Sequence, residues 1–113
     1  MSVAAAPSLS PGTVLLGRYE VLRKLGSGGS ATTYLVHDRR WDTHVAFKLL
    51  RDASPELIDM LRTEFARLRE LFHPHLCPVH EIGVWHADGF SIPFFTADYL
   101  PGLTLDRYAR RNV

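Results

Sequence analysis

Hydrophobic and polar residues alternate in several short stretches of the chain, a pattern typical of strands with one buried face. The first stretch runs from Tyr19 to Leu25 and ends at a glycine. β-Branched and aromatic residues are frequent in the next two, Thr32–His37 and His44–Leu50. We expect three strands here, and their short connections favour antiparallel pairing.

A single long helix is expected after the third strand. Ser54 is suited to cap it, Pro55 fits the first helical position, and Glu56 favours the first turn. The helix should run to about Phe72, because Pro74 disfavours helical geometry at the residue before it.

Two further strands are expected at Val79–Trp85 and Ser91–Tyr99, with Asp88-Gly89 as the turn between them. Thr104 is suited to cap another helix near the C-terminus. Together these elements predict an α+β fold, in which one main helix packs against a five-stranded antiparallel sheet and a further helix starts near the C-terminus.

Glu64 is out of place in the long helix. At about 100° per residue, it falls in the middle of the apolar arc, of which Met60 marks one edge. An unpaired buried carboxylate is strongly unfavourable, so a cation should meet it. Lys48 is the natural partner, because it shares the small face of its strand with Ala46. The alternative, in which Glu64 and Lys48 both reach solvent, stays open at this point.

Composition excludes little. The chain has 113 residues, a formal net charge of +1 and 46% hydrophobic residues, as in ordinary soluble domains, and neither nucleic acid nor a membrane is favoured as a partner. The single cysteine, Cys77, suits a reducing compartment, so we expect a cytoplasmic protein. Residues 1–12 are mostly small residues and proline, which predicts a flexible leader rather than a secretory signal.

Three glycines stand within Gly26–Gly29, directly before a strand. Backbone without side chains allows a ligand to approach closely. Dinucleotide-binding folds also use such a pattern, but a helix follows it there, whereas Thr32–Val36 has a strand composition. A Walker phosphate loop is excluded because the Gly-Lys-Ser/Thr ending is missing.

Metal-ligand side chains gather in one short stretch, which contains His73, His75, Cys77 and His80. Their spacing matches no standard zinc pattern. We interpret the cysteine as a small buried side chain and the histidines as loop residues, and no metal site is predicted.

Five features follow one another along the chain: LGSGGSA, VAFK, a helix with Glu64, HPHLCPV and FFTADYLPG. In this order and spacing they resemble the N-terminal, ATP-binding lobe of bacterial eukaryotic-like (Hanks-type) serine/threonine protein kinases. The resemblance covers Arg18 to about Tyr108. It implies a kinase N-lobe at residues 13–100, after the leader, and a hinge exit with the start of a truncated C-lobe at residues 101–113.

The resemblance also implies roles for individual residues. Lys48 would contact the α- and β-phosphates of ATP, and Glu64 would hold its ammonium group; these two are the catalytic candidates. Ala97 matches the gatekeeper position, and Ala31 stands where the family has a third glycine. The implied nucleotide-binding residues are Leu25, Gly26, Ser27, Gly28, Gly29, Thr33, Ala46, Lys48, Ala97, Asp98 and Leu100.

The implied activity is transfer of the ATP γ-phosphate to serine or threonine hydroxyls of a protein substrate, with Mg²⁺. The family's catalytic loop and metal-binding aspartate lie in a second lobe, and Pro101–Val113 contains neither. We therefore expect covalent continuation into a C-lobe that supplies the Mg²⁺ ligands, and no activity from this stretch alone. The alternative is a non-catalytic half-kinase or pseudokinase that binds nucleotide or a partner and regulates that partner.

Overall fold

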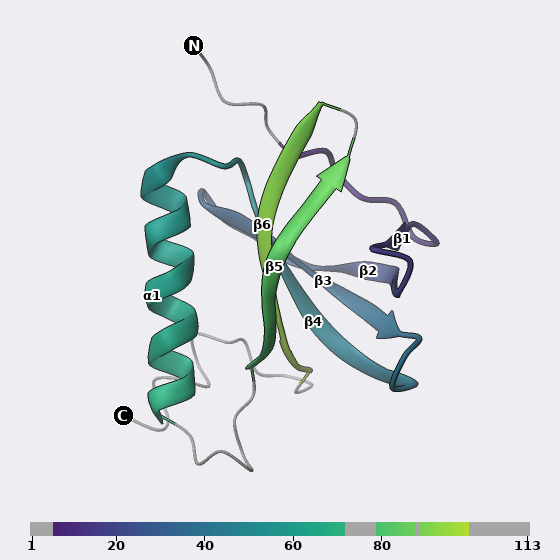
Figure 1. Ribbon diagram of the computed structural model, residues 1–113. Coiled ribbons are helices and arrows are strands. Elements are labelled where there is room, and N and C mark those ends of the chain that lie inside the picture. Colours follow the sequence, from purple (N-terminus) through teal and green to yellow (C-terminus); the bar gives the residue numbers. More distant parts are fainter. Residues whose placement is uncertain (1–5, 72–78, 88, 100–113) are drawn as a thin grey trace.

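The computed structural model describes residues 6–71, 79–87 and 89–99. Within them, an antiparallel sheet of six strands lies beside one helix, α1 (Pro55–Leu71), as Figure 1 shows. The strand order across the sheet is β1-β2-β3-β4-β6-β5. The strands are β1 (Val14–Leu15), β2 (Tyr19–Ser27), β3 (Ala31–Asp38), β4 (Thr43–Leu50), β5 (Val79–Ala87) and β6 (Phe90–Asp98).

All five predicted strands and the long helix are present, but the sheet has one strand more than expected. The additional strand, β1, contains two residues and pairs with the start of β2. The chain reverses between them through Leu16 and Gly17, which have φ angles of 56° and 64°. A strand of two residues is too short to produce an alternating pattern, so the sequence gives no sign of it.

Part of the expected flexible leader is bonded to the domain. The amide of Ala6 donates to the carbonyl of Arg51 (2.6 Å), and the amide of Leu9 donates to the hydroxyl of Tyr34 (3.1 Å). The side chains of Ala6 and Leu9 also pack against the core. Residues 6–12 therefore differ from a free leader, because their few apolar side chains find buried partners on the sheet.

The two faces of the sheet are covered differently. On one face, Phe47 stacks on Phe94 with ring centroids 4.4 Å apart, and Tyr19 meets Phe47 edge-on at 5.4 Å. On the other face, α1 packs against β4, β5 and β6. Among the helix residues whose burial is described (55–70), the buried side chains are Leu57, Leu61 and Leu68.

One position of the expected apolar arc is wrong: Met60 is 56% exposed. It lies at the edge of the arc, beyond the part of the helix that the sheet covers.

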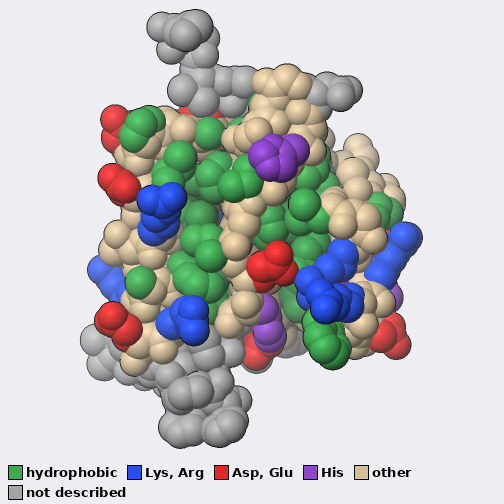
Figure 2. Space-filling model, in the orientation of Figure 1, with side chains coloured by type: hydrophobic (Ala, Val, Ile, Leu, Met, Phe, Trp, Pro, Cys, Tyr) green, Lys and Arg blue, Asp and Glu red, His purple; other side chains and the backbone are tan. Residues whose placement is uncertain are grey.

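Figure 2 shows apolar side chains between α1 and β5 on this face of the molecule, and the exposed large hydrophobic residues of β5 are Ile82 and Val84. Among the described residues, no helix combines the length and apolar character that crossing a membrane requires.

Candidate functional site

The sheet register brings the predicted site residues of different strands side by side. Thr33 of β3 stands opposite Gly26 of β2 on one side and Lys48 of β4 on the other. Ala46 of β4 stands opposite Ala97 of β6. Residues two apart along a strand share a face. Thr33, Ala46, Lys48 and Ala97 therefore line one face, the same face on which α1 packs.

Lys48 and Glu64 form the ion pair that the helix pattern predicts. The ammonium nitrogen of Lys48 lies 2.7 Å from each carboxylate oxygen of Glu64. It also lies 5.8 Å from the ring centroid of Phe95, its cross-strand neighbour. The side chains of Lys48 and Glu64 are 18% and 28% exposed, so the pair is partly buried and still accessible to solvent. The predicted contact is confirmed, and the alternative with both side chains in solvent is wrong.

The glycines of the turn between β2 and β3 are not explained by the packing of the described residues. A Cβ atom added at Gly26, Gly28 or Gly29 would meet none of their atoms within 4 Å. None of the three has a positive φ, unlike Gly17 and Gly89. Neither close packing nor left-handed backbone requires glycine here.

Leu25 lies at an irregularity of β2. The register with β3 shifts between Lys24 and Gly26, so Leu25 is an extra residue in its strand. Such bulges redirect a side chain and bend the strand. Leu25 is half-buried immediately before the glycines. Leu35, which sequence reasoning did not select, is buried opposite Ala46 in the row that contains Ala97.

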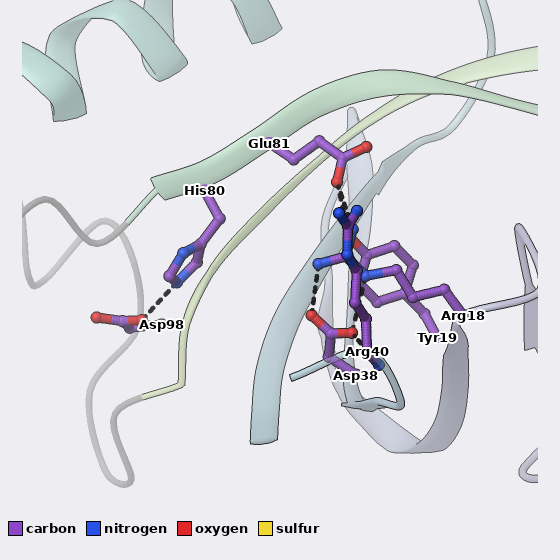
Figure 3. A network of polar contacts seen from close by, with 7 residues as sticks. All are labelled: Arg18, Tyr19, Asp38, Arg40, His80, Glu81 and Asp98. Atoms are coloured by element: carbon purple, nitrogen blue, oxygen red, sulfur yellow. Dashed lines mark hydrogen bonds and ion pairs between the residues drawn. The ribbon is translucent and has the colours of Figure 1, made fainter. Parts of the chain in front are cut away.

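The predicted hinge begins at Asp98, the last residue of β6. Its carboxylate contacts the imidazole of His80 on β5 at 2.5 Å, as Figure 3 shows. Leu100, the helix expected after Thr104, and three of the four possible metal ligands (His73, His75 and Cys77) lie outside the described residues. Among the described residues, no three histidine, cysteine or acidic side chains form a group that could hold a metal ion.

A second charged cluster was not predicted (Figure 3); it includes Tyr19 and Asp38, which pair at the ends of β2 and β3 that lie away from the turn between these strands (the glycine turn). Asp38, at the end of β3, accepts two hydrogen bonds from the guanidinium of Arg18, at 2.8 and 2.7 Å. It also accepts one from the amide of Arg40 at 3.0 Å. Glu81 on β5 contacts the same guanidinium at 3.2 Å and accepts a hydrogen bond from the Tyr19 hydroxyl at 2.8 Å. We call Arg18, Tyr19, Asp38 and Glu81 the Arg18 network.

The charges of the Arg18 network stabilise one another. The hydrogen bonds from Arg18 lower the pKa of Asp38, and the same contact raises the pKa of Arg18. Burial, with the hydrogen bond to Glu81, raises the pKa of the Tyr19 hydroxyl. The network joins β2, β3 and β5, so its evident role is to fix these strands. The sequence contained a signal for Asp38, because it lies two residues after Val36 and four after Tyr34, on the same face of β3 as these two buried side chains.

No protein-family model matches the chain. The DNA damage-responsive serine/threonine-protein kinase RqkA of Deinococcus radiodurans is 41% identical over 103 residues, which cover 88% of this chain and 15% of RqkA. The serine/threonine-protein kinase PrkC of Bacillus subtilis is 33% identical over 104 residues, which cover 89% of this chain and 15% of PrkC. The chain thus spans about 15% of the length of these relatives.

The crystal structure of the Mycobacterium tuberculosis PknI kinase domain has a similar fold. The TM-score is 0.61 and the identity 30%, and the match covers 86% of this chain and 39% of the PknI kinase domain. The match therefore places this chain against a minor part of a complete kinase domain. By sequence and by fold, the chain belongs to the bacterial eukaryotic-like (Hanks-type) serine/threonine protein kinases, and it corresponds to the N-terminal lobe of their kinase domain.

Proposed function

We propose that this lobe binds ATP between the glycine turn and the Lys48–Glu64 pair, and that the intact protein transfers the γ-phosphate to serine or threonine hydroxyls of a protein substrate. The contact of the Lys48 ammonium with both oxygens of Glu64, 2.7 Å each, is the observation that carries the proposal. The whole activity is part of the proposal, because the chain spans about 15% of the kinases that it resembles.

Lys48 has bonding capacity left for a phosphate oxygen. An ammonium group has three N–H donors, and Glu64 is its hydrogen-bond acceptor among the described residues. The carboxylate holds the cation at the sheet face while both side chains keep some exposure to solvent. A held, accessible cation is what positioning of a triphosphate requires.

The glycine turn supplies backbone donors. In the described part of the chain, the amides of Gly29 and Ser30 donate no hydrogen bond. Successive amides in a turn attract anions, and the missing side chains allow phosphate oxygens to approach. This explains glycines that the packing of the described residues does not require.

Small and apolar side chains near Lys48 suit an adenine ring. We assign its walls to Leu25, Thr33, Ala46 and Ala97, and its polar edge to the backbone from Asp98 to Leu100. Mg²⁺ fits the triphosphate in this site, and we assign the metal ligands to a second lobe. The single cysteine suits a reducing compartment, and we assign the protein to the cytoplasm.

Calorimetry with Lys48→Met tests the nucleotide site. We expect the affinity for ATP to fall by about tenfold or more, because a charge-assisted contact to phosphate is lost. The affinity for adenosine should change by less than about twofold, because adenosine has no phosphate. Lys24→Met is the matched control: Lys24 is exposed on β2 opposite Tyr34, and its loss changes the net charge equally.

Equal loss of ATP and adenosine binding in Lys48→Met would contradict the proposed role of Lys48, and absence of ATP binding by the unsubstituted chain would contradict the nucleotide site. A non-catalytic regulator would use the same site. Phosphorylation of a protein by the intact polypeptide, lost in Lys48→Met, separates the enzyme from such a regulator.

A further inference from the structure

Arg51, the residue after β4, holds the glycine turn from outside the proposed phosphate site. Its guanidinium donates to the carbonyl of Gly29 at 2.5 Å, and its backbone amide donates to the carbonyl of Ser30 at 2.8 Å. Its own carbonyl accepts the hydrogen bond from Ala6. Two consecutive carbonyls of the turn therefore point toward Arg51. In Figure 1 the tip of the β2–β3 hairpin points toward the N-terminal half of α1.

The hydrogen bond to Gly29 also fixes the amide of Ser30. The Gly29 carbonyl and the Ser30 amide belong to one peptide group, which is trans. In a planar trans peptide the N–H points opposite to the C=O. Because the guanidinium holds the carbonyl, the Ser30 N–H points away from Arg51, and among the described residues it has no acceptor.

Among the described residues, the Arg51 guanidinium is the hydrogen-bond partner of this peptide group itself, while the Gly28 amide closes the turn on the carbonyl of Ala31 at 2.9 Å. A Cβ atom at Gly28 or Gly29 would have open space around it, so packing does not select one orientation. Glycine reaches more backbone conformations than other residues, and rotation of a peptide next to glycine is correspondingly easy. The direction of the Ser30 amide thus depends on the side chain of Arg51.

Arg51 is also linked to the start of α1. Its Nε donates to Asp52 at 3.2 Å, and the other carboxylate oxygen of Asp52 accepts the amide of Ser54 at 2.9 Å. Ser54 immediately precedes α1, the helix that carries Glu64. One arginine therefore connects the glycine turn to the helix that holds Lys48 in place.

We propose that Arg51 is a positioning residue for the triphosphate: by holding the Gly29 carbonyl, it directs the Ser30 amide toward the phosphates. The inference rests on the proposed nucleotide site. Arg51 itself touches no phosphate in this arrangement, since it lies behind the turn. Its contribution appears in the affinity for phosphate-bearing ligands and not in the affinity for adenosine.

Calorimetry on the 113-residue chain with Arg51→Gln and Arg51→Lys tests this role. We expect Arg51→Gln to lower ATP affinity about fivefold and to leave adenosine affinity within about twofold, because one oriented amide contact is lost. Arg51→Lys keeps a charged donor and should restore ATP affinity to within about twofold. Arg39→Gln is the matched control, since it breaks an exposed arginine–carboxylate pair (Arg39 to Glu20, 2.9 Å) away from the turn.

An NMR measurement without ligand separates positioning from loss of charge. The amide resonance of Ser30 should shift in Arg51→Gln, because the orientation of its peptide group changes, but not in Arg39→Gln. If the unsubstituted chain binds ATP in a Lys48-dependent manner and Arg51→Gln behaves like Arg39→Gln, the role of Arg51 is overturned while the nucleotide site stands. Equal loss of ATP and adenosine binding in Arg51→Gln overturns it as well. Absence of ATP binding by the unsubstituted chain overturns both proposals.

Discussion

The molecule contains two carboxylate–cation sites. Their contact distances are similar, but they differ in exposure to solvent and in how many of their hydrogen bonds are satisfied. In the Arg18 network, Asp38 is 4% exposed and accepts three hydrogen bonds, two from Arg18 and one from the backbone. In the other site, Lys48 and Glu64 are 18% and 28% exposed. Both sites have contacts of 2.7 Å between the charged groups.

The difference supports the proposal that the Arg18 network is a structural site and that the Lys48–Glu64 pair belongs to a binding site. A buried charge network is tolerated when its hydrogen bonds are satisfied, and removal of one member then leaves an uncompensated charge. The Arg18 network meets this condition and needs no ligand. The Lys48 ammonium, in contrast, lies on an accessible face beside a glycine turn, and it has capacity for another acceptor. Similar distances therefore do not imply similar roles.

Asp38→Asn should have the largest effect on stability. It leaves the Arg18 guanidinium without its buried carboxylate, which typically lowers the free energy of unfolding by about 3 kcal/mol. Urea denaturation measures this value. The ratio of ATP to adenosine affinity should stay the same in variant molecules that remain folded. A loss below about 1 kcal/mol would remove the distinction between the two sites.

Glu64→Gln should have a small effect on stability and a large effect on ATP affinity, the opposite of Asp38→Asn. We expect the free energy of unfolding to change by less than about 1 kcal/mol, because the pair is partly exposed. ATP affinity should fall by about tenfold, because the Lys48 side chain loses the charge that holds it. Calorimetry and urea denaturation of the same samples measure both quantities. A large loss of stability with unchanged ATP affinity would make the pair a structural site.

Tyr19→Phe should have a smaller effect. It removes the hydroxyl that donates to Glu81 at 2.8 Å and leaves the ring contacts with Phe47 and Phe94. A single hydrogen bond of this kind contributes about 1 kcal/mol to the free energy of unfolding. Urea denaturation provides the measurement. No loss in Tyr19→Phe would show that Glu81 depends on Arg18 alone.

Lowering the pH should reduce the contribution of Asp38 to the free energy of unfolding. The pKa of Asp38 lies below its ordinary value of 3.8 in the folded chain, because Arg18 and backbone amides favour the carboxylate. Its contribution to stability is therefore complete above the unfolded pKa and is lost as the pH falls through the folded pKa. The difference in unfolding free energy between the unsubstituted chain and Asp38→Asn should stay constant from about pH 7 to 5 and shrink below about pH 4. A constant difference down to pH 2 would contradict this assignment.

The charged pair and the glycines of the candidate site could be predicted from the sequence because they break the local pattern, whereas the other nucleotide-binding residues were implied by the family resemblance. Glu64 stands among leucines of α1, Lys48 stands beside Ala46, and three glycines precede a strand. Each is unfavourable alone, and the two charges compensate each other. Asp38 was missed because the predicted strand ended at His37, whereas β3 extends one residue further and places Asp38 on the face of Tyr34 and Val36.

Arg51 was not predictable in the same way. Its partner in the turn is the carbonyl of Gly29, 22 residues earlier. Every residue has a backbone carbonyl, so the residue types contain no sign of this contact. The same holds for the bond from Leu9 to the hydroxyl of Tyr34, which fixes part of the expected leader. Contacts of this kind depend on the register of the sheet and on the path of the chain.

The sequence by itself determined the strands, the helix and the need for a cation at Glu64, because periodicity and the unfavourable burial of charge act locally. Tertiary structure decided which side chains meet: it aligned Thr33, Lys48 and Gly26 in one row, closed the Arg18 network and brought Arg51 behind the glycine turn. The physical reason is that hydrogen bonds and ion pairs extend over about 3 Å. Residues far apart in the chain therefore interact only after the sheet has fixed their positions.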